Sequence, residues 1–137
     1  MVSHILESVS GLANFGLYFF SAVGLLIVFS YVYGMVTPYP EIQLIKEGKM
    51  APAISYGGAV FGFICPLVSA IAHSVSFIDM LIWAFIALVI QILVFLFLKT
   101  VFSSLVEDVS QDKISSAIFL SVFSVAVGLL NAASMSY

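Results

Sequence analysis

Five polar residues of this chain could do chemistry, because they stand inside or beside long apolar stretches. They are Asn14, His73, Asp79, Gln91 and Asn131. Ionisable groups within membrane segments commonly mark pathways for protons or ions, and histidine is the side chain that titrates near neutral pH. The same side chains could instead cap helix ends and join helices by hydrogen bonds. The sequence leaves both interpretations open: a proton or cation site, or a structural role.

Spacing places most of these residues at one level of the membrane. Ser69 and Asn131 lie equally far along two apolar stretches, counted from Ala51 and Lys113. At a helical rise of ~1.5 Å per residue, they should therefore sit at the same depth. The other three members of the predicted group fall near the same boundary. The predicted polar cluster comprises Asn14, Ser69, His73, Asp79 and Asn131.

Gln91 lies deeper than this cluster, inside the third apolar stretch and at a depth shared by Ser121 and Ser124 in the fourth and by Ser30 in the first. Hydrogen bonds between membrane helices contribute ~0.6–2 kcal/mol each. Gln91 could therefore join two helices, or it could line a pore.

No arrangement of residues points to an enzyme. The chain has no Gly-x-Ser-x-Gly, no His-Glu-x-x-His and a single cysteine, Cys65. We therefore predict no catalytic residue, no cofactor and no metal site. A nucleic-acid partner is excluded as well, because the net charge is −3 and there are only four basic side chains.

Composition sets the fold class. The 137 residues are 63% hydrophobic and 8% charged, with a mean hydropathy of +1.23, which leaves too little polar surface for a soluble globule. Four apolar stretches, at 13–36, 53–72, 77–98 and 114–133, each approach the ~20 residues that cross a bilayer as a helix. We predict an all-α membrane protein, one transmembrane domain over 1–137 with four transmembrane helices.

The helices are expected to form two repeated hairpins with the same orientation. The segment that starts at Lys49 aligns weakly with the one that starts at Lys113, and the residues around Pro66 align with those around Gly128. Each unit holds an even number of spans, so the two copies would be related by an axis along the membrane normal. The predicted repeats cover about 13–74 and about 77–136.

The second stretch carries small residues at helical spacing, on one stripe: Ala51, Ser55, Gly58, Gly62, Pro66, Ser69 and His73. Small residues let membrane helices approach closely, so Gly58, Gly62, Pro66 and Ser69 are predicted packing residues. Gly128 in the fourth stretch is another. The stripe could be filled within the monomer or by a second copy, and we expect a homo-oligomer or a complex with other membrane proteins. Phe61 and Phe63 are expected to point away from it and to tolerate leucine.

Lysine placement predicts the orientation. Lys46, Lys49, Lys99 and Lys113 all fall at one end of a four-span arrangement. The excess of basic residues in cytoplasmic loops makes that end cytoplasmic. Both termini and the short turn after His73 are then expected outside.

Three segments of the chain form a recognisable set: Thr37-Pro38-Tyr39 followed by Glu41, Pro-Leu-Val-Ser-Ala-Ile-Ala-His-Ser at 66–74 and Gly-Leu-Leu-Asn-Ala-Ala at 128–133. In these segments the chain resembles the YjfL-type bacterial inner membrane proteins, the domain-of-unknown-function 350 family. It implies a multi-pass protein of the bacterial inner membrane with two repeated hairpins and no established activity. It also gives a hint of a role in envelope stress.

Two functions follow from these observations. The first is a non-enzymatic structural or interaction component in envelope maintenance or stress response. The second is a small ion channel or proton-coupled transporter that uses the cluster of His73, Asp79 and Asn131. Neither needs a cofactor.

Overall fold

The computed structural model describes residues 1–135; Ser136, where the second predicted repeat ends, and Tyr137 lie outside the described residues. The described part is helical and has no strand. Its elements are α1 (Val2–Val36), α2 (Glu41–Lys46), α3 (Met50–His73), α4 (Phe77–Val101), α5 (Leu105–Ser110) and α6 (Ile114–Ser134).

The predicted all-α class with four spans is confirmed, since α1, α3, α4 and α6 are each long and apolar enough to cross a membrane. The helix α1 begins earlier than the expected residue 13, because no proline or glycine pair interrupts the residues before it. It ends where Thr37 adopts an extended backbone ahead of Pro38, as the residue before a proline prefers.

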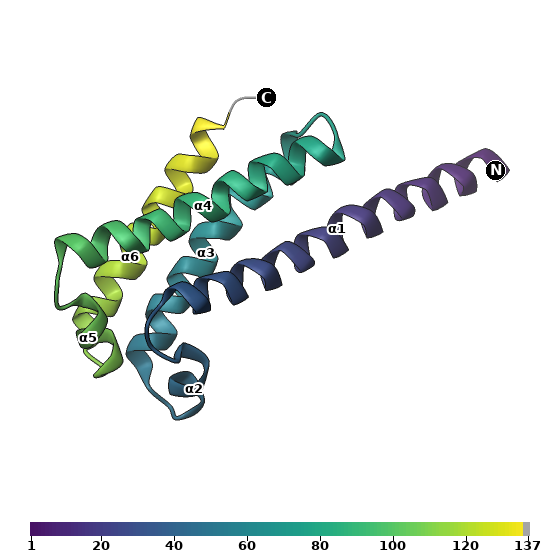
Figure 1. Cartoon of the computed structure of the whole chain (residues 1–137). Helices are drawn as coiled ribbons and strands as arrows, with labels where there is room; N and C mark the ends of the chain where they lie inside the picture. Colours follow the sequence, from purple (N-terminus) through teal and green to yellow (C-terminus); the bar gives the residue numbers. More distant parts are fainter. Residues whose placement is uncertain (136–137) are drawn as a thin grey trace.

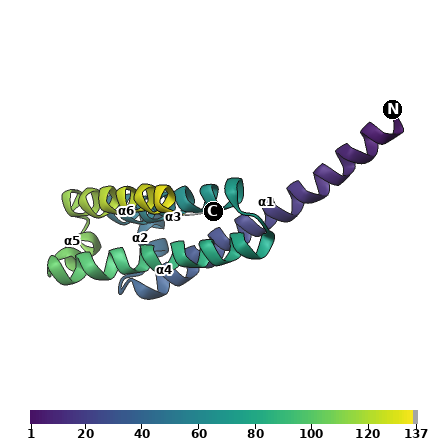
Figure 2. The same ribbon diagram turned by 90° about the horizontal axis from the view of Figure 1, so that it is seen from above.

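The long helices form two layers (Figures 1 and 2). α3 and α6 lie side by side in one layer, and α1 and α4 lie in the other. α3 and α6 run in the same direction, because contacts pair early residues with early ones: the Ala51 amide donates to Asp112 Oδ1, and the Ser69 hydroxyl donates to the Ala132 carbonyl. The first half of α1 extends away from the other helices.

Glycines set the closest approach between α3 and α6. A Cβ built on Gly58 would lie 2.6 Å from the Cα of Ser121, and one on Gly62 would lie 2.8 Å from the carbonyl carbon of Ser124. Real Cβ atoms do not approach other atoms so closely, so only glycine fits. The structure thus buries the predicted stripe from Ala51 to Pro66, with Gly58 and Gly62 against α6. Ser69 is half-buried and bonds to α6, and His73 is exposed.

Phe63 packs on the face of α3 that lies next to the glycine stripe. Its ring is fully buried and stacks on Phe29 of α1, with ring centroids 4.5 Å apart and planes at 1°. Phe61, in contrast, is 57% exposed. Both rings therefore lie off the stripe, as expected, and α3 is packed on two sides: its glycine stripe meets α6, and the adjacent face meets the aromatic side chains of α1. Whether Phe63 tolerates leucine stays a prediction, which its burial makes less favourable.

The connections α2 and α5 share one backbone geometry. Gly48 and Asp112, which precede the first turns of α3 and α6, both have positive φ, of 87° and 63°. Lys49 and Lys113 then hold the N-cap positions of these two helices. Three main-chain hydrogen bonds at the end of α2 recur at the end of α5. They are Glu47 N to Gln43 O, Gly48 N to Ile45 O and Lys49 N to Leu44 O in the first connection, and Gln111 N to Glu107 O, Asp112 N to Val109 O and Lys113 N to Asp108 O in the second. This agreement supports a repeat of the connections, and the repeat of the complete hairpins stays a prediction.

Candidate functional site

The structure distributes the predicted polar cluster over separate local contacts. Asp79 Oδ2 accepts a hydrogen bond from the Val75 amide at 3.2 Å, and the Asp79 amide donates to Ser76 Oγ at 3.1 Å. His73 Nδ1 lies 3.1 Å from the Ser69 carbonyl one turn earlier in α3. These contacts stabilise helix ends, and their use by a proton or cation stays a prediction.

The two asparagines of the cluster lie in different surroundings. Asn14 is exposed on the first half of α1, and Asn131 is half-buried on α6. The side-chain nitrogen of Asn131 is buried without a hydrogen-bond partner. Asn14 lines a pocket beside α1 to which neither Asp79 nor Asn131 contributes.

Gln91 lies buried at the level where α3, α4 and α6 meet. Its Nε2 donates to the carbonyl of Ser124 at 2.9 Å, and a Cβ on Gly62 would lie 2.7 Å from that nitrogen. Of the three serines predicted at the depth of Gln91, Ser124 is the one that it contacts by a hydrogen bond, through the main-chain carbonyl. Oε1 of Gln91 is buried and has no partner, so a single hydrogen bond joins α4 to α6 beside Gly62 of α3.

A second polar group, missed by the sequence reasoning, lies at the α1–α2 connection. Glu41 opens α2 and is only 3% exposed, and neither carboxylate oxygen has a hydrogen-bond partner. The hydroxyls of Tyr33 and Tyr39 are also buried without partners, and both phenols lie close enough to interact electrostatically with the carboxylate.

Burial governs the protonation of Glu41. Removal from water disfavours the charged carboxylate and raises the pKa of Glu41 to about 8. The neighbouring Tyr39 hydroxyl, close to the carboxylate but outside ordinary hydrogen-bond geometry, offsets part of this rise. Burial likewise raises the pKa of Tyr39. A carboxyl in this position can hold a proton near neutral pH or balance a cation.

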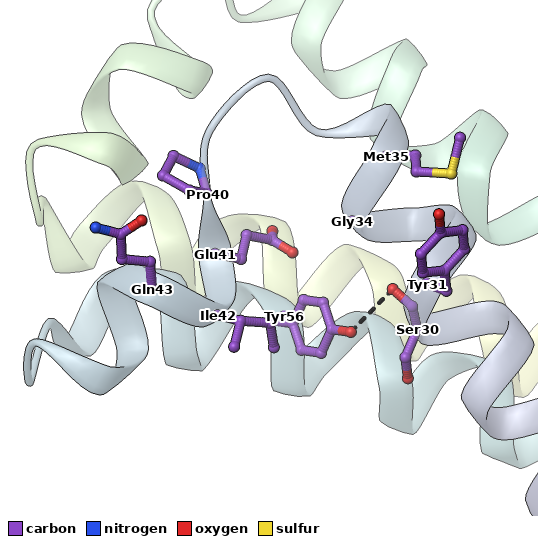
Figure 3. A pocket seen from close by; sticks show the side chains of 9 residues that line it. All are labelled: Ser30, Tyr31, Gly34, Met35, Pro40, Glu41, Ile42, Gln43 and Tyr56. Atoms are coloured by element: carbon purple, nitrogen blue, oxygen red, sulfur yellow. Dashed lines mark hydrogen bonds between the residues drawn. The ribbon is translucent and has the colours of Figure 1, made fainter.

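A pocket of about 440 Å³ adjoins Glu41 between α1, α2 and α3. Figure 3 shows the Glu41 side chain directed from the start of α2 toward Gly34 and Tyr31 of α1. The Tyr56 hydroxyl of α3 donates to the Ser30 carbonyl at 2.9 Å and so fixes the opposite wall. The walls are mostly apolar, and Glu41 is the one acidic side chain among those that line the pocket.

A comparison of the two connections in the sequence could have singled out Glu41 as an unusual residue. In the shared geometry of the two connections, Glu41 and Leu105 are each the first residue of a six-residue helix, and both are buried. An acidic residue at a position that its counterpart fills with leucine marks an exception to the pattern. The sequence alignment started at Lys49, after this position, and did not include it.

The other connection holds a charged group with a structural role. Asp108 of α5 accepts hydrogen bonds from Ser116 at 2.8 Å and Ser104 at 3.2 Å, and its Oδ1 lies 3.3 Å from Lys113 Nζ. The bond from Ser116 and the charge of Lys113 lower the pKa of Asp108. These contacts tie α5 to the start of α6.

Among residues 1–135 there is no group of three His, Cys, Asp or Glu side chains that could hold a metal ion.

Comparison with known proteins places this architecture in a family. The pattern of the Domain of Unknown Function (DUF350) family matches residues 7–135. The chain is 37% identical over 134 residues to UPF0719 inner membrane protein YjfL of Escherichia coli K12, and the aligned region covers 98% of this chain and 99% of that protein. It is 28% identical over 121 residues to UPF0719 transmembrane protein YshE of Bacillus subtilis, covering 86% and 88%. No solved structure matches the chain. The protein, with its four apolar helices and its near full-length similarity to an inner membrane protein, belongs to the DUF350 family of membrane proteins.

Proposed function

We propose that this protein is a non-enzymatic component of the bacterial inner membrane that acts by association with a second copy of itself or with other membrane proteins. The observation that carries the proposal is the uncovered first part of α1. No residue of α1 before Phe29 is buried, and nothing lies within 4 Å of a Cβ built on Gly11, Gly16 or Gly24.

Glycine destabilises a helix, so a glycine inside a helix is expected where it makes a compensating contact. Each one lowers helix stability by ~1 kcal/mol relative to alanine, and in membrane proteins the usual gain is close packing against another helix. Within α3 that gain is visible, since Gly58 and Gly62 face α6. Gly16 and Gly24 of α1 have no such neighbour among residues 1–135, and a partner helix would supply one.

The test is the mass of the purified full chain in a mild detergent, measured by light scattering. We expect an oligomer that Gly16→Leu and Gly24→Leu shift toward the monomer. Gly57→Leu is the matched control, because Gly57 is an exposed glycine of α3 with open space around it. A monomeric wild type would contradict self-association, and equal dissociation by Gly57→Leu would assign the effect to the added side chain alone.

The cellular role that we propose for this assembly is envelope maintenance or stress response, and a deletion strain tests it. Loss of the gene should sensitise cells to envelope stress, and Gly16→Leu should fail to restore resistance. An unchanged phenotype together with clear ion flux through reconstituted protein would favour the channel or transporter instead. The close approach of Gly62 and Gly128 speaks against a path between α3 and α6.

A further inference from the structure

Glu41 is an acidic residue at a position that its counterpart in the second connection fills with leucine. Leu105 opens α5 as Glu41 opens α2, and it is buried and packs with the apolar core. A leucine therefore satisfies the geometry of this turn at any pH. Glu41 is buried to the same extent, and neither of its oxygens has a partner among the described residues. Only the protonated acid, which is neutral, suits such surroundings.

The groups around the Glu41 carboxyl do not compensate for a negative charge. The hydroxyls of Tyr33 on α1 and of Tyr39 in the connection are buried near it without partners of their own. The other phenols on this side are Tyr31 of α1 and Tyr56 of α3, whose hydroxyl is bonded to the main chain of α1. Phenols in general stay neutral from pH 6 to 9, and no Lys or His side chain within residues 1–135 shifts the pKa of Glu41. An ionised Glu41 in this position is a buried charge without a counter-charge, which is strongly unfavourable.

The helix α2 has few other anchors in the fold. Leu44 and Ile45 are half-buried, and its residues other than these and Glu41 are exposed, including the charged Lys46. In α5 the counterpart of Ile45 is the fully buried Val109, so that helix is held more firmly. Irregular backbone joins α2 to α1 over residues 37–40 and to α3 over 47–49, so α2 can move without disturbing the long helices. A helix of six residues is not stable alone in water, so α2 melts when it loses its contacts.

We propose that Glu41 is a proton-operated switch: α2 stays docked on α3 while Glu41 carries a proton, and it leaves that place when the proton is lost. The proton passes from a carboxyl oxygen to water, and the carboxylate that remains is stabilised by hydration once α2 has moved. Undocking uncovers the part of the apolar core against which Leu44 packs. The surface at this end of the helices, where α1 connects to α3, therefore changes with pH.

The size of the effect follows from the linkage between the proton and the position of α2. The pKa of Glu41 is about 8 while α2 is docked, and the ordinary pKa of 4.5 applies once the carboxylate reaches water. The equilibrium constant for undocking then rises with pH between these two values, by about 50-fold from pH 6 to pH 8. Above pH 8 it levels off, because both forms are then ionised.

Hydrogen exchange of main-chain amides tests the switch on the full chain in a neutral detergent. The Leu44 amide donates to the Pro40 carbonyl in the first connection, and the Asp108 amide donates to the Ser104 carbonyl at the same place in the second. Exchange is followed by mass spectrometry in peptides that cover the two connections and is corrected for its intrinsic dependence on pH. Protection around Leu44 should fall about 50-fold from pH 6 to pH 8, while protection around Asp108 should stay constant.

Substitutions in the first connection assign the titration to one side chain. Glu41→Leu copies the second connection, and Glu41→Gln keeps the size of the side chain without a titratable proton. In both variants protection around Leu44 should no longer depend on pH. Glu47→Gln is the control, because Glu47 is an exposed acidic residue of the same connection, and it should keep the full change.

Three results would overturn the proposal. Constant protection around Leu44 in wild type from pH 6 to pH 8 would mean that loss of the proton does not release α2. An equal fall around Asp108 would mean that Glu41 gives up its proton only when the whole chain unfolds. An unchanged pH dependence in Glu41→Gln and Glu41→Leu would assign the titration to another group. The first two results come from the wild-type protein alone, so they do not depend on whether the variants fold.

Discussion

Gly62 of α3 and Gly128 of α6 bring two membrane helices into backbone contact. A Cβ built on Gly128 would lie 2.7 Å from the Cα of Gly62 and 2.8 Å from its carbonyl carbon. The contact is between main chains, which no rotation of a side chain can relieve.

The first prediction concerns this contact. Gly62→Ala and Gly128→Ala should each lower the free energy of unfolding by about 1–3 kcal/mol, because the added methyl forces the helices apart. Gly57→Ala should leave stability unchanged or raise it by up to ~1 kcal/mol, since its Cβ meets open space. Thermal or denaturant unfolding in detergent measures the difference, and equal effects at the three positions would refute the packing.

The second prediction concerns the aromatic contact between α1 and α3. Phe63→Leu removes the ring that stacks on Phe29 and should lower stability by about 1–2 kcal/mol. Phe61→Leu is the control, because Phe61 is largely exposed two residues away in the same helix. The unfolding of the two variants is compared under one set of conditions. A larger loss for Phe61→Leu would mean that α1 does not pack on Phe63.

The third prediction concerns the pH dependence of stability. The folded chain raises the pKa of Glu41 from 4.5 to about 8, so the folded state holds a proton that the unfolded state releases. The stabilisation that comes from this bound proton is complete below pH 4.5 and is lost progressively as the pH rises to about 8. Over that range the free energy of unfolding falls by at most about 1.4 kcal/mol per pH unit.

Glu41→Gln tests this assignment, because glutamine cannot lose a proton in that range. Between pH 5 and 8, the unfolding temperature of wild type should fall relative to that of Glu41→Gln. Parallel curves for the two proteins would show that Glu41 is ionised already at pH 5, and that the carboxylate has access to water or to a cation.

The fourth prediction concerns orientation, which we propose from the lysines. In a Cys65→Ala background, Val75→Cys lies in the exposed α3–α4 turn, and Gln43→Cys lies on the exposed side of α2. A membrane-impermeant thiol reagent should label Val75→Cys in intact cells from the outer side of the inner membrane, and Gln43→Cys only after the membrane is opened. The reverse pattern would place the termini and the α3–α4 turn in the cytoplasm.

Hydropathy and glycine spacing predicted much of this fold because they depend on the chain alone. Apolar length determines which segments can span a bilayer, and Gly58 and Gly62 share a helix face whatever the neighbour is. The depth shared by Gln91 and Ser124 follows from helical rise in the same way.

Other features depend on which helices meet, and periodicity carries little information on that. Phe63 is buried because α1 crosses α3 at Phe29, a contact with no signature in either helix. Glu41 is buried because the turn after Pro38 and Pro40 folds the start of α2 against α1 and α3. A proline-rich segment with an acidic residue is typical of an exposed loop, so the residue types around Glu41 do not indicate that its side chain is buried.

The length of α1 has a consequence for the reach of the protein beyond the bilayer. Its 35 residues extend ~52 Å at a rise of 1.5 Å, whereas the hydrocarbon core is ~30 Å thick. Even a tilt of ~40°, at the limit of common membrane helices, leaves some of its turns outside that core. The N-terminal turns, with His4 and Glu7, then stand in the headgroup layer or above it as a rigid stalk, where a water-exposed protein can touch this chain without entering the lipid.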